Sequence, residues 1–122
     1  MFIGLVSLLA IKYFICGLVI HLFCDWILQN AWMSDHKSSL KHPAAYVHSG
    51  LHLLGLLLVF PWYAAIIVAI IHLLIDTRMP LAFWRGFFRQ TQEGDVALHV
   101  QMWSDQVLHI TVLAVVALAI GG

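Results

Sequence analysis

The chain has 122 residues, of which 62% are hydrophobic and only 10% are charged, and its net charge is zero with neutral histidines. A soluble domain carries about 25% charged residues, so this chain has too little polar surface to cover a water-soluble globule. The balanced charge gives no basic field for nucleic acid. Two cysteines, Cys16 and Cys24, do not make a disulfide framework. The composition indicates an all-α integral membrane protein.

Four apolar stretches follow one another along the chain. The first is too long for a signal peptide and lacks a basic N-terminal region, so we expect it to be retained. At about 1.5 Å per residue, the second and third are near the lower limit for crossing a core of about 30 Å. The pattern predicts one domain over residues 1–122, a transmembrane four-helix bundle. The four spans are expected at about 2–28, 44–60, 62–76 and 98–120.

The connections between these stretches set the expected topology. Pro61 marks a tight hairpin, whereas the long connections 30–43 and 77–97 hold five of the six Lys and Arg residues. By the positive-inside rule, the long loops are cytoplasmic and both termini lie outside a plasma (inner) membrane. Segment 79–88 mixes Trp, Phe and Arg, which favours an interfacial segment between the third and fourth spans. A plain hydrophobic loop is the alternative.

Histidine and aspartate recur in the apolar stretches at a single spacing. Residues four apart lie on one face of an α-helix, one turn from each other, so each pair can present two ligands to one point. One pair falls on each predicted span: His21/Asp25, His48/His52, His72/Asp76 and Asp105/His109.

The depth of these pairs can be compared from the sequence. The second and third pairs centre on Gly50 and Leu74, which are 11 and 13 residues from Pro61. The first pair is near the end of its span and the fourth is in the first half of its span, so both also lie toward the long-loop side. We therefore expect all four pairs to meet in one layer, as in helix bundles that hold dinuclear sites.

The chemistry of the eight side chains favours metal ions. Three buried carboxylates without cations would be costly. Five imidazoles and three carboxylates supply enough ligands for two divalent cations, and one hydroxide would neutralise the remaining charge. Zinc is favoured, and iron and manganese also suit these ligands. The alternative is a proton relay or a hydrogen-bonded polar core.

Several neighbours have secondary expected roles. Gln29 and Gln106 are spaced to orient a ligand or a substrate, while Cys24 points to another face and is interpreted as packing. Five cations ring the expected mouth of the site, where they either attract an anionic headgroup or phosphate or only set the topology: Lys37, Lys41, Arg78, Arg85 and Arg89.

Four sequence segments together resemble a known family. They are HLFCDWILQNAWMSDHK (21–37), HSGLH (48–52), HLLID (72–76) and DQVLH (105–109). Their order and spacing resemble DUF3307, a family of small bacterial and phage membrane proteins whose name implies no activity. A looser similarity to membrane-bound metal-dependent hydrolases would imply chemistry only by analogy.

The favoured function is a membrane-embedded metal-dependent hydrolase with a dinuclear site near the cytoplasmic leaflet, acting on a lipid-like or amphiphilic ester or phosphoester. One of Asp25, Asp76 and Asp105 would serve as general base. A di-iron oxygenase or hydroxylase and a non-enzymatic metal or proton transporter or sensor remain open, and a holin is disfavoured. The expected partners are membrane lipids, and a homodimer is compatible with so small a unit.

Overall fold

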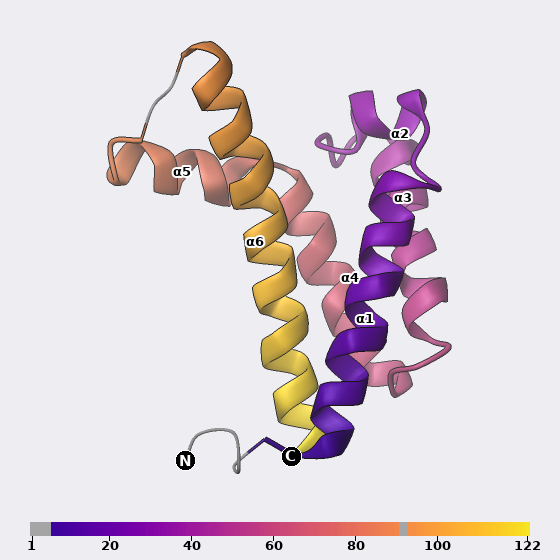
Figure 1. The fold of residues 1–122 in the computed structure, drawn as a ribbon. Coiled ribbons are helices and arrows are strands. Elements are labelled where there is room, and N and C mark those ends of the chain that lie inside the picture. The colour runs from indigo at the N-terminus through magenta and orange to yellow at the C-terminus, as the bar shows by residue number, and fades with distance from the viewer. Residues whose placement is uncertain (1–5, 91–92) are drawn as a thin grey trace.

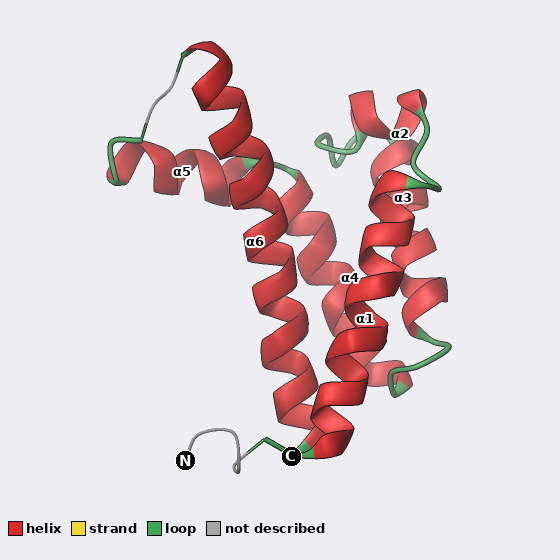
Figure 2. Ribbon diagram, in the orientation of Figure 1, coloured by secondary structure: helices red, strands yellow, loops and turns green. Residues whose placement is uncertain are grey.

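The computed structural model describes residues 6–90 and 93–122, and every regular element in these two ranges is a helix (Figure 2). This confirms the all-α prediction. The six helices are α1 Leu8–Trp26, α2 Ala31–His36, α3 Pro43–Leu56, α4 Trp62–Asp76, α5 Met79–Phe87 and α6 Gly94–Gly121.

Four of the helices pack in a ring. Helix α1 contacts α3 and α6, and α4 contacts the same two helices from the other side. Figure 1 shows α2 and α5 at one end of the molecule, which we call the loop end. The C-terminus, the start of α1 and the α3–α4 hairpin lie toward the opposite end, which we call the terminus end. The alternating helix directions follow from these connections.

Local sequence signals set where the helices begin and end. Ser7 caps α1 by accepting a hydrogen bond from the Ala10 amide at 2.9 Å, and Pro43 occupies the first turn of α3, where its missing N–H is not needed. Helix α4 begins directly after Pro61. It ends at a sharp turn in which Arg78 has a φ of 66°, in the left-handed region.

Two helices, α1 and α6, are long and apolar enough to cross a membrane. The expectation that the second and third stretches also cross by themselves is not confirmed. Helices α3 and α4 have 14 and 15 residues, which correspond to about 21–23 Å at the rise of an α-helix. Helices α4 and α5 together meet the length and hydropathy of a span, but they are bent by 58°.

The predicted boundaries need three adjustments. Helix α6 begins at Gly94, earlier than expected, and α3 ends at Leu56 because the last residues before Pro61 form the turn. The short helix α2 lies within a connection that we expected to be irregular. Segment 79–88 is mostly the helix α5, which crosses α6 near the loop end (Figure 1). Residues 2–5 of the first predicted stretch lie outside the described residues.

The hydrophobic core fills the terminus-end half of the ring. We call it the apolar layer; its buried members are Leu56, Phe60, Ala64, Ala65, Val68 and Leu113. Small residues allow the helices to approach closely here. A Cβ atom built on Gly17 would lie 3.0 Å from the Phe60 ring, and one on Gly121 would lie 2.5 Å from the backbone of Ala10. The apolar layer therefore closes the bundle on the side away from the long loops.

Candidate metal centre

The eight His and Asp side chains predicted from the sequence form one cluster in the loop-end half of the ring. We call it the His/Asp layer. Seven of its members have exposed fractions of only 0–5%, and the Asp105 side chain is 21% exposed. The expectation that the four pairs lie at matching depth is met: His21, Asp25, His48, His52, His72, Asp76, Asp105 and His109 all take part in the contacts described below.

Asp25 is the first focus of the His/Asp layer. Its carboxylate oxygens lie 2.9 Å from Nε2 of His52, 3.1 Å from Nε2 of His48 and 3.4 Å from Nε2 of His21. Two of these imidazoles come from α3, while His21 shares α1 with Asp25. Three ring nitrogens from two helices thus converge on one carboxylate.

Asp76 is the second focus. Its oxygens lie 2.9 Å from Nε2 of His72, 3.1 Å from Nε2 of His109 and 3.4 Å from Nε2 of His48. His48 therefore stands between the two carboxylates and contacts both. Asp105, on α6, places its Oδ1 3.5 Å from Nε2 of His109.

The spacing of four residues explains the local part of this geometry. Within α1, α4 and α6, the two members of each pair contact each other one helical turn apart. The α3 pair has no carboxylate of its own, so His48 and His52 take their contacts from α1 and α4. The donor atoms form three overlapping sets, and within each set all of them lie within 4.8 Å of one another. The sets are Asp25/His48/His52/His72, His21/His72/His109 and Asp76/Asp105/His109.

The donor atoms suit a metal better than a closed hydrogen-bond network. Both ring nitrogens of His48 and Nε2 of His72 are buried and have no hydrogen-bond partner within the described residues. His48 Nε2 and His72 Nε2 are close to carboxylates, but the groups are not aligned as hydrogen bonds require. Buried polar atoms are almost always paired. Unpaired imidazole nitrogens beside carboxylates are the donors that zinc and iron take.

Gln106 has the orienting position expected for it. Its amide nitrogen donates to Asp25 at 3.1 Å and to Asp105 at 3.4 Å, and its carbonyl oxygen lies 3.1 Å from Nε2 of His21. The amide thereby ties α6 to α1 across the ring. Gln29 instead lines the adjoining cavity, where its Oε1 atom is buried without a partner in the described ranges.

Cys24 packs as expected. It is 3% exposed, and its nearest polar partner is the Leu51 carbonyl at 3.8 Å from Sγ. Ser49, between the two α3 histidines, points away from them and donates to the Ala69 carbonyl at 2.7 Å. Neither side chain is placed to act as a nucleophile at the His/Asp layer.

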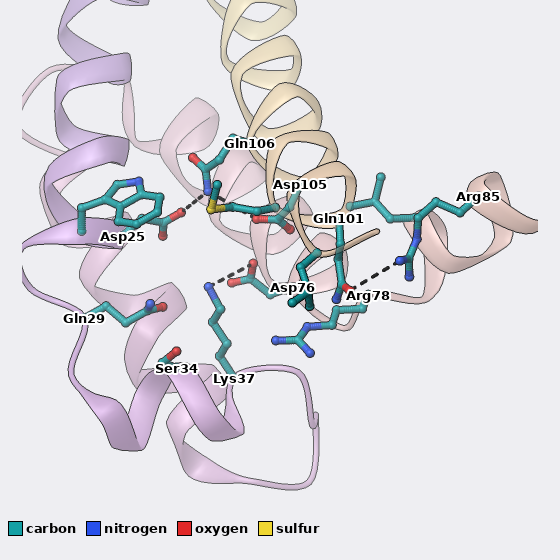
Figure 3. A pocket seen from close by; sticks show the side chains of 14 residues that line it. Asp25, Gln29, Ser34, Lys37, Asp76, Arg78, Arg85, Gln101, Asp105 and Gln106 are labelled. Carbon is teal, nitrogen blue, oxygen red and sulfur yellow. Dashed lines mark hydrogen bonds and ion pairs between the residues drawn. The ribbon is translucent and has the colours of Figure 1, made fainter. Parts of the chain in front are cut away.

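A polar cavity of about 370 Å³ lies on the loop-end side of the His/Asp layer. All three aspartates line it, and Figure 3 shows their carboxylates on one side of the space. Three of the five cations expected at the mouth also line it, namely Lys37, Arg78 and Arg85. Lys41 and Arg89 are not among its lining residues.

One contact at the cavity was not specified by the sequence. Lys37 extends from the end of α2 until its Nζ lies 4.0 Å from Asp76 Oδ1 (Figure 3). The sequence signal nearest to this contact is Asn30, which caps the start of α2 by accepting a hydrogen bond from the Met33 amide. That cap predicts a helical turn, but it does not predict where the turn packs.

The comparisons with known proteins place the chain in a family without assigning an activity. The model of the family described as "Protein of unknown function (DUF3307)" matches residues 13–121, which include the whole His/Asp layer. No curated protein and no solved structure matches the chain. The similarity to metal-dependent hydrolases therefore stays an expectation. With nearly its full length matched, the chain belongs to the DUF3307 family.

Proposed function

We propose that this protein is a membrane-embedded metal-dependent hydrolase that uses two divalent cations, with zinc favoured, to cleave an ester or phosphoester of an amphiphilic substrate. The observation that carries the proposal is the convergence of five buried imidazoles on Asp25 and Asp76 beside a polar cavity. Such a donor set at the wall of a cavity leaves room for a water molecule and a substrate next to the ions.

The geometry favours dividing the ligands between two ions. One ion would take Asp25 with His48 and His52, whose Nε2 atoms lie 3.1 and 2.9 Å from its carboxylate. The other would take Asp76 with His72 and His109, at 2.9 and 3.1 Å. His21 lies within reach of both sets.

Asp105 is the best candidate for the general base among the three predicted catalytic aspartates. Two divalent ions would supply Lewis-acid activation of water and of the scissile oxygen. Asp25 and Asp76 are each enclosed by three imidazoles, whereas Asp105 contacts one imidazole at 3.5 Å and is partly exposed to the cavity. Its Oδ1 lies 3.5 Å from His109 Nε2 and its Oδ2 accepts from Gln106 at 3.4 Å, and with only these two long contacts the carboxylate can accept a proton from the attacking water.

The apolar layer argues against a transport function. An ion crossing the bundle from the His/Asp layer to the terminus end would have to pass buried Leu56, Phe60 and Leu113, which offer it no polar contact. The polar cavity opens the layer from the loop end. A site reached from that end, with an apolar layer behind it, suits an enzyme better than a conduit.

The proposed setting is a plasma membrane with the loop end in the cytoplasm and both termini outside. Cations gather at the loop end, including Lys37, Arg78 and Arg85 around the cavity, and basic loops remain cytoplasmic. In this orientation the His/Asp layer lies in the cytoplasmic leaflet. The substrate would then enter from that leaflet, with membrane lipids as neighbours.

Metal analysis combined with an activity assay tests the proposal. Protein purified and reconstituted in phosphatidylcholine nanodiscs should hold two zinc ions per chain and release nitrophenol from p-nitrophenyl decanoate or decyl p-nitrophenyl phosphate. The Asp105→Asn variant should keep both metals and lose at least a hundredfold in rate. Two irons with visible absorption would favour an oxygenase instead, and less than one metal per chain would refute the metal centre.

A further inference from the structure

The polar cavity adjoins an apolar groove between α5 and α6, and Leu81 lines both spaces. Resting on the proposed function, we infer that they form one binding site for a single-chain phosphate amphiphile. The cavity holds the phosphate beside the His/Asp layer, and the groove holds the hydrocarbon chain. This selects a phosphoester over a carboxylic ester as the substrate class.

Arg85 supplies the main anion contact. Its Nη1 donates to Gln101 Oε1 at 3.4 Å, and its Nε is buried with no partner among the described residues. The Gln101 contact engages Nη1 (Figure 3), and on the Nε–Nη2 edge of the guanidinium the buried Nε has no acceptor among the described residues. That edge matches two oxygens of a phosphate group, which it binds with two parallel hydrogen bonds.

Arg78 adds a second cation at a position that favours glycine. Its φ of 66° is in the left-handed region, which L-residues other than glycine rarely adopt. Its side chain lines the cavity between Lys37 and Arg85 in Figure 3. The cost of the backbone conformation is explained if the guanidinium is needed in the cavity.

The total charge of the site calls for an anion. Two divalent ions and the three cations Lys37, Arg78 and Arg85 would outweigh the three carboxylates that line the cavity. A phosphate group carries one or two negative charges and reduces this excess. A neutral carboxylic ester does not, so it would leave the guanidiniums without a counter-charge in a partly buried space.

The groove supplies the apolar half of the site. It encloses about 610 Å³ and is lined mainly by apolar side chains, among them Trp84 of α5 and Trp103, Val107 and Leu108 of α6. It extends along α6 from Val100 to Thr111, which is roughly 16 Å at the helical rise. A hydrocarbon chain fits this length and gains from burial along it. The polar cavity thus lies against one face of α6 and the apolar groove against another.

Binding of alkyl phosphates to the zinc-loaded protein in nanodiscs tests the inference. Decyl phosphate should bind at least tenfold more tightly than inorganic phosphate and than decanol, and it should quench tryptophan fluorescence when it carries a doxyl group on its chain. Arg85→Gln should weaken decyl phosphate at least tenfold and leave decanol unchanged. Its matched control is Arg89→Gln, which removes a nearby cation outside the cavity and should have no effect.

A second pair of variants tests the groove. Ser104→Trp fills it and should abolish the advantage of decyl phosphate over inorganic phosphate. Val115→Trp, on an exposed face of the same helix, should not. Arg78→Gly should weaken phosphate binding while the thermal stability stays equal or rises, because glycine removes the left-handed strain.

Zinc content separates the two proposals. If zinc is bound but decyl phosphate binds no better than inorganic phosphate or decanol, the substrate inference is wrong and the metal centre stands. If zinc is absent but Arg85-dependent binding of decyl phosphate persists, the amphiphile site stands and the hydrolase proposal is wrong. If Arg85→Gln and Arg89→Gln weaken the binding of decyl phosphate equally, the binding depends only on general surface charge and the inference is wrong.

Discussion

The two halves of the helix ring are stabilised in opposite ways. In the apolar layer, Leu56, Phe60 and Leu113 pack against alanines, and this contact is complete without any further group. In the His/Asp layer, the same four helices bring imidazoles and carboxylates together, and some of the ring nitrogens have no hydrogen-bond partner. One half is closed by apolar packing, whereas the other half holds donor groups that could bind metal ions. The same four helices therefore carry both an apolar base and a cluster of candidate metal ligands.

Removing a carboxylate from the His/Asp layer should have the largest effect, because it should lower both the metal content and the stability of the fold. Asp76→Ala leaves His72, His109 and Lys37 without their shared partner. We expect loss of at least one metal per chain and destabilisation of about 3–5 kcal/mol, as when one partner of a buried ion pair is removed. Elemental analysis and denaturant unfolding measure the two effects. His99→Ala, at an exposed histidine of α6, is the control, and retention of both metals in Asp76→Ala would exclude Asp76 as a ligand.

Truncation in the apolar layer should reduce stability without affecting the metals. Leu113→Ala removes a side chain that is 2% exposed, and such cavities cost about 2–5 kcal/mol. The metal content should stay at the wild-type value because Leu113 belongs to the apolar layer and supplies no donor atom. A loss of metal in this variant would mean that the two layers are coupled and would contradict their separation.

Chelation should act on one layer only. If free metal stands at a hundredfold excess over its dissociation constant, it stabilises the folded chain by about 2.7 kcal/mol. Dialysis against EDTA should therefore lower the melting temperature of the wild type and of Leu113→Ala equally. The double variant Asp25→Ala/Asp76→Ala should not respond. A response of similar size in the double variant would mean that the chelator acts elsewhere.

Loss of the Gln106 amide should have the smallest effect of the four. Gln106→Ala removes the contacts to Asp25, Asp105 and His21 but no proposed ligand. Neighbours that orient metal ligands contribute about 10–100-fold in metal affinity. A competition titration against a chromophoric chelator would detect this change, with Gln101→Ala as the control because Gln101 contacts Arg85 instead. An unchanged affinity would assign Gln106 to packing.

The sequence predicted the His/Asp layer well because helix geometry carries most of the information. A spacing of four residues puts both members of each pair on one face. The distance from Pro61 gives the height of the second and third pairs, and the position within the span gives that of the first and fourth. Cys24 and Gln106 follow from the same geometry. Hydrophobic composition was enough to predict an all-helical fold with helices long and apolar enough to cross a membrane.

The remaining features depend on tertiary packing. The contact of Lys37 with Asp76 depends on how α2 folds back on α3, and no pattern in the sequence encodes that return. The left-handed backbone conformation of Arg78 could not be predicted either, because glycine is the residue that normally marks such a turn. The sequence separated the third stretch from segment 79–88, but it did not specify the 58° bend between the two helices. Helix α5 lines both the cavity and the groove, and α4 reaches the cavity at Asp76.

The ring closes between α1 and α6, and this has a consequence for biosynthesis. Ser7 donates to the carbonyl of Gly121, and Gln106 bridges to Asp25 higher in the ring. Helix α6 emerges from the ribosome after the other three ring helices, so Asp25 and His21 wait for their last partners until translation has passed His109. If the His/Asp layer binds the proposed metal ions, their loading is therefore a late step of assembly that follows the synthesis of all four ring helices.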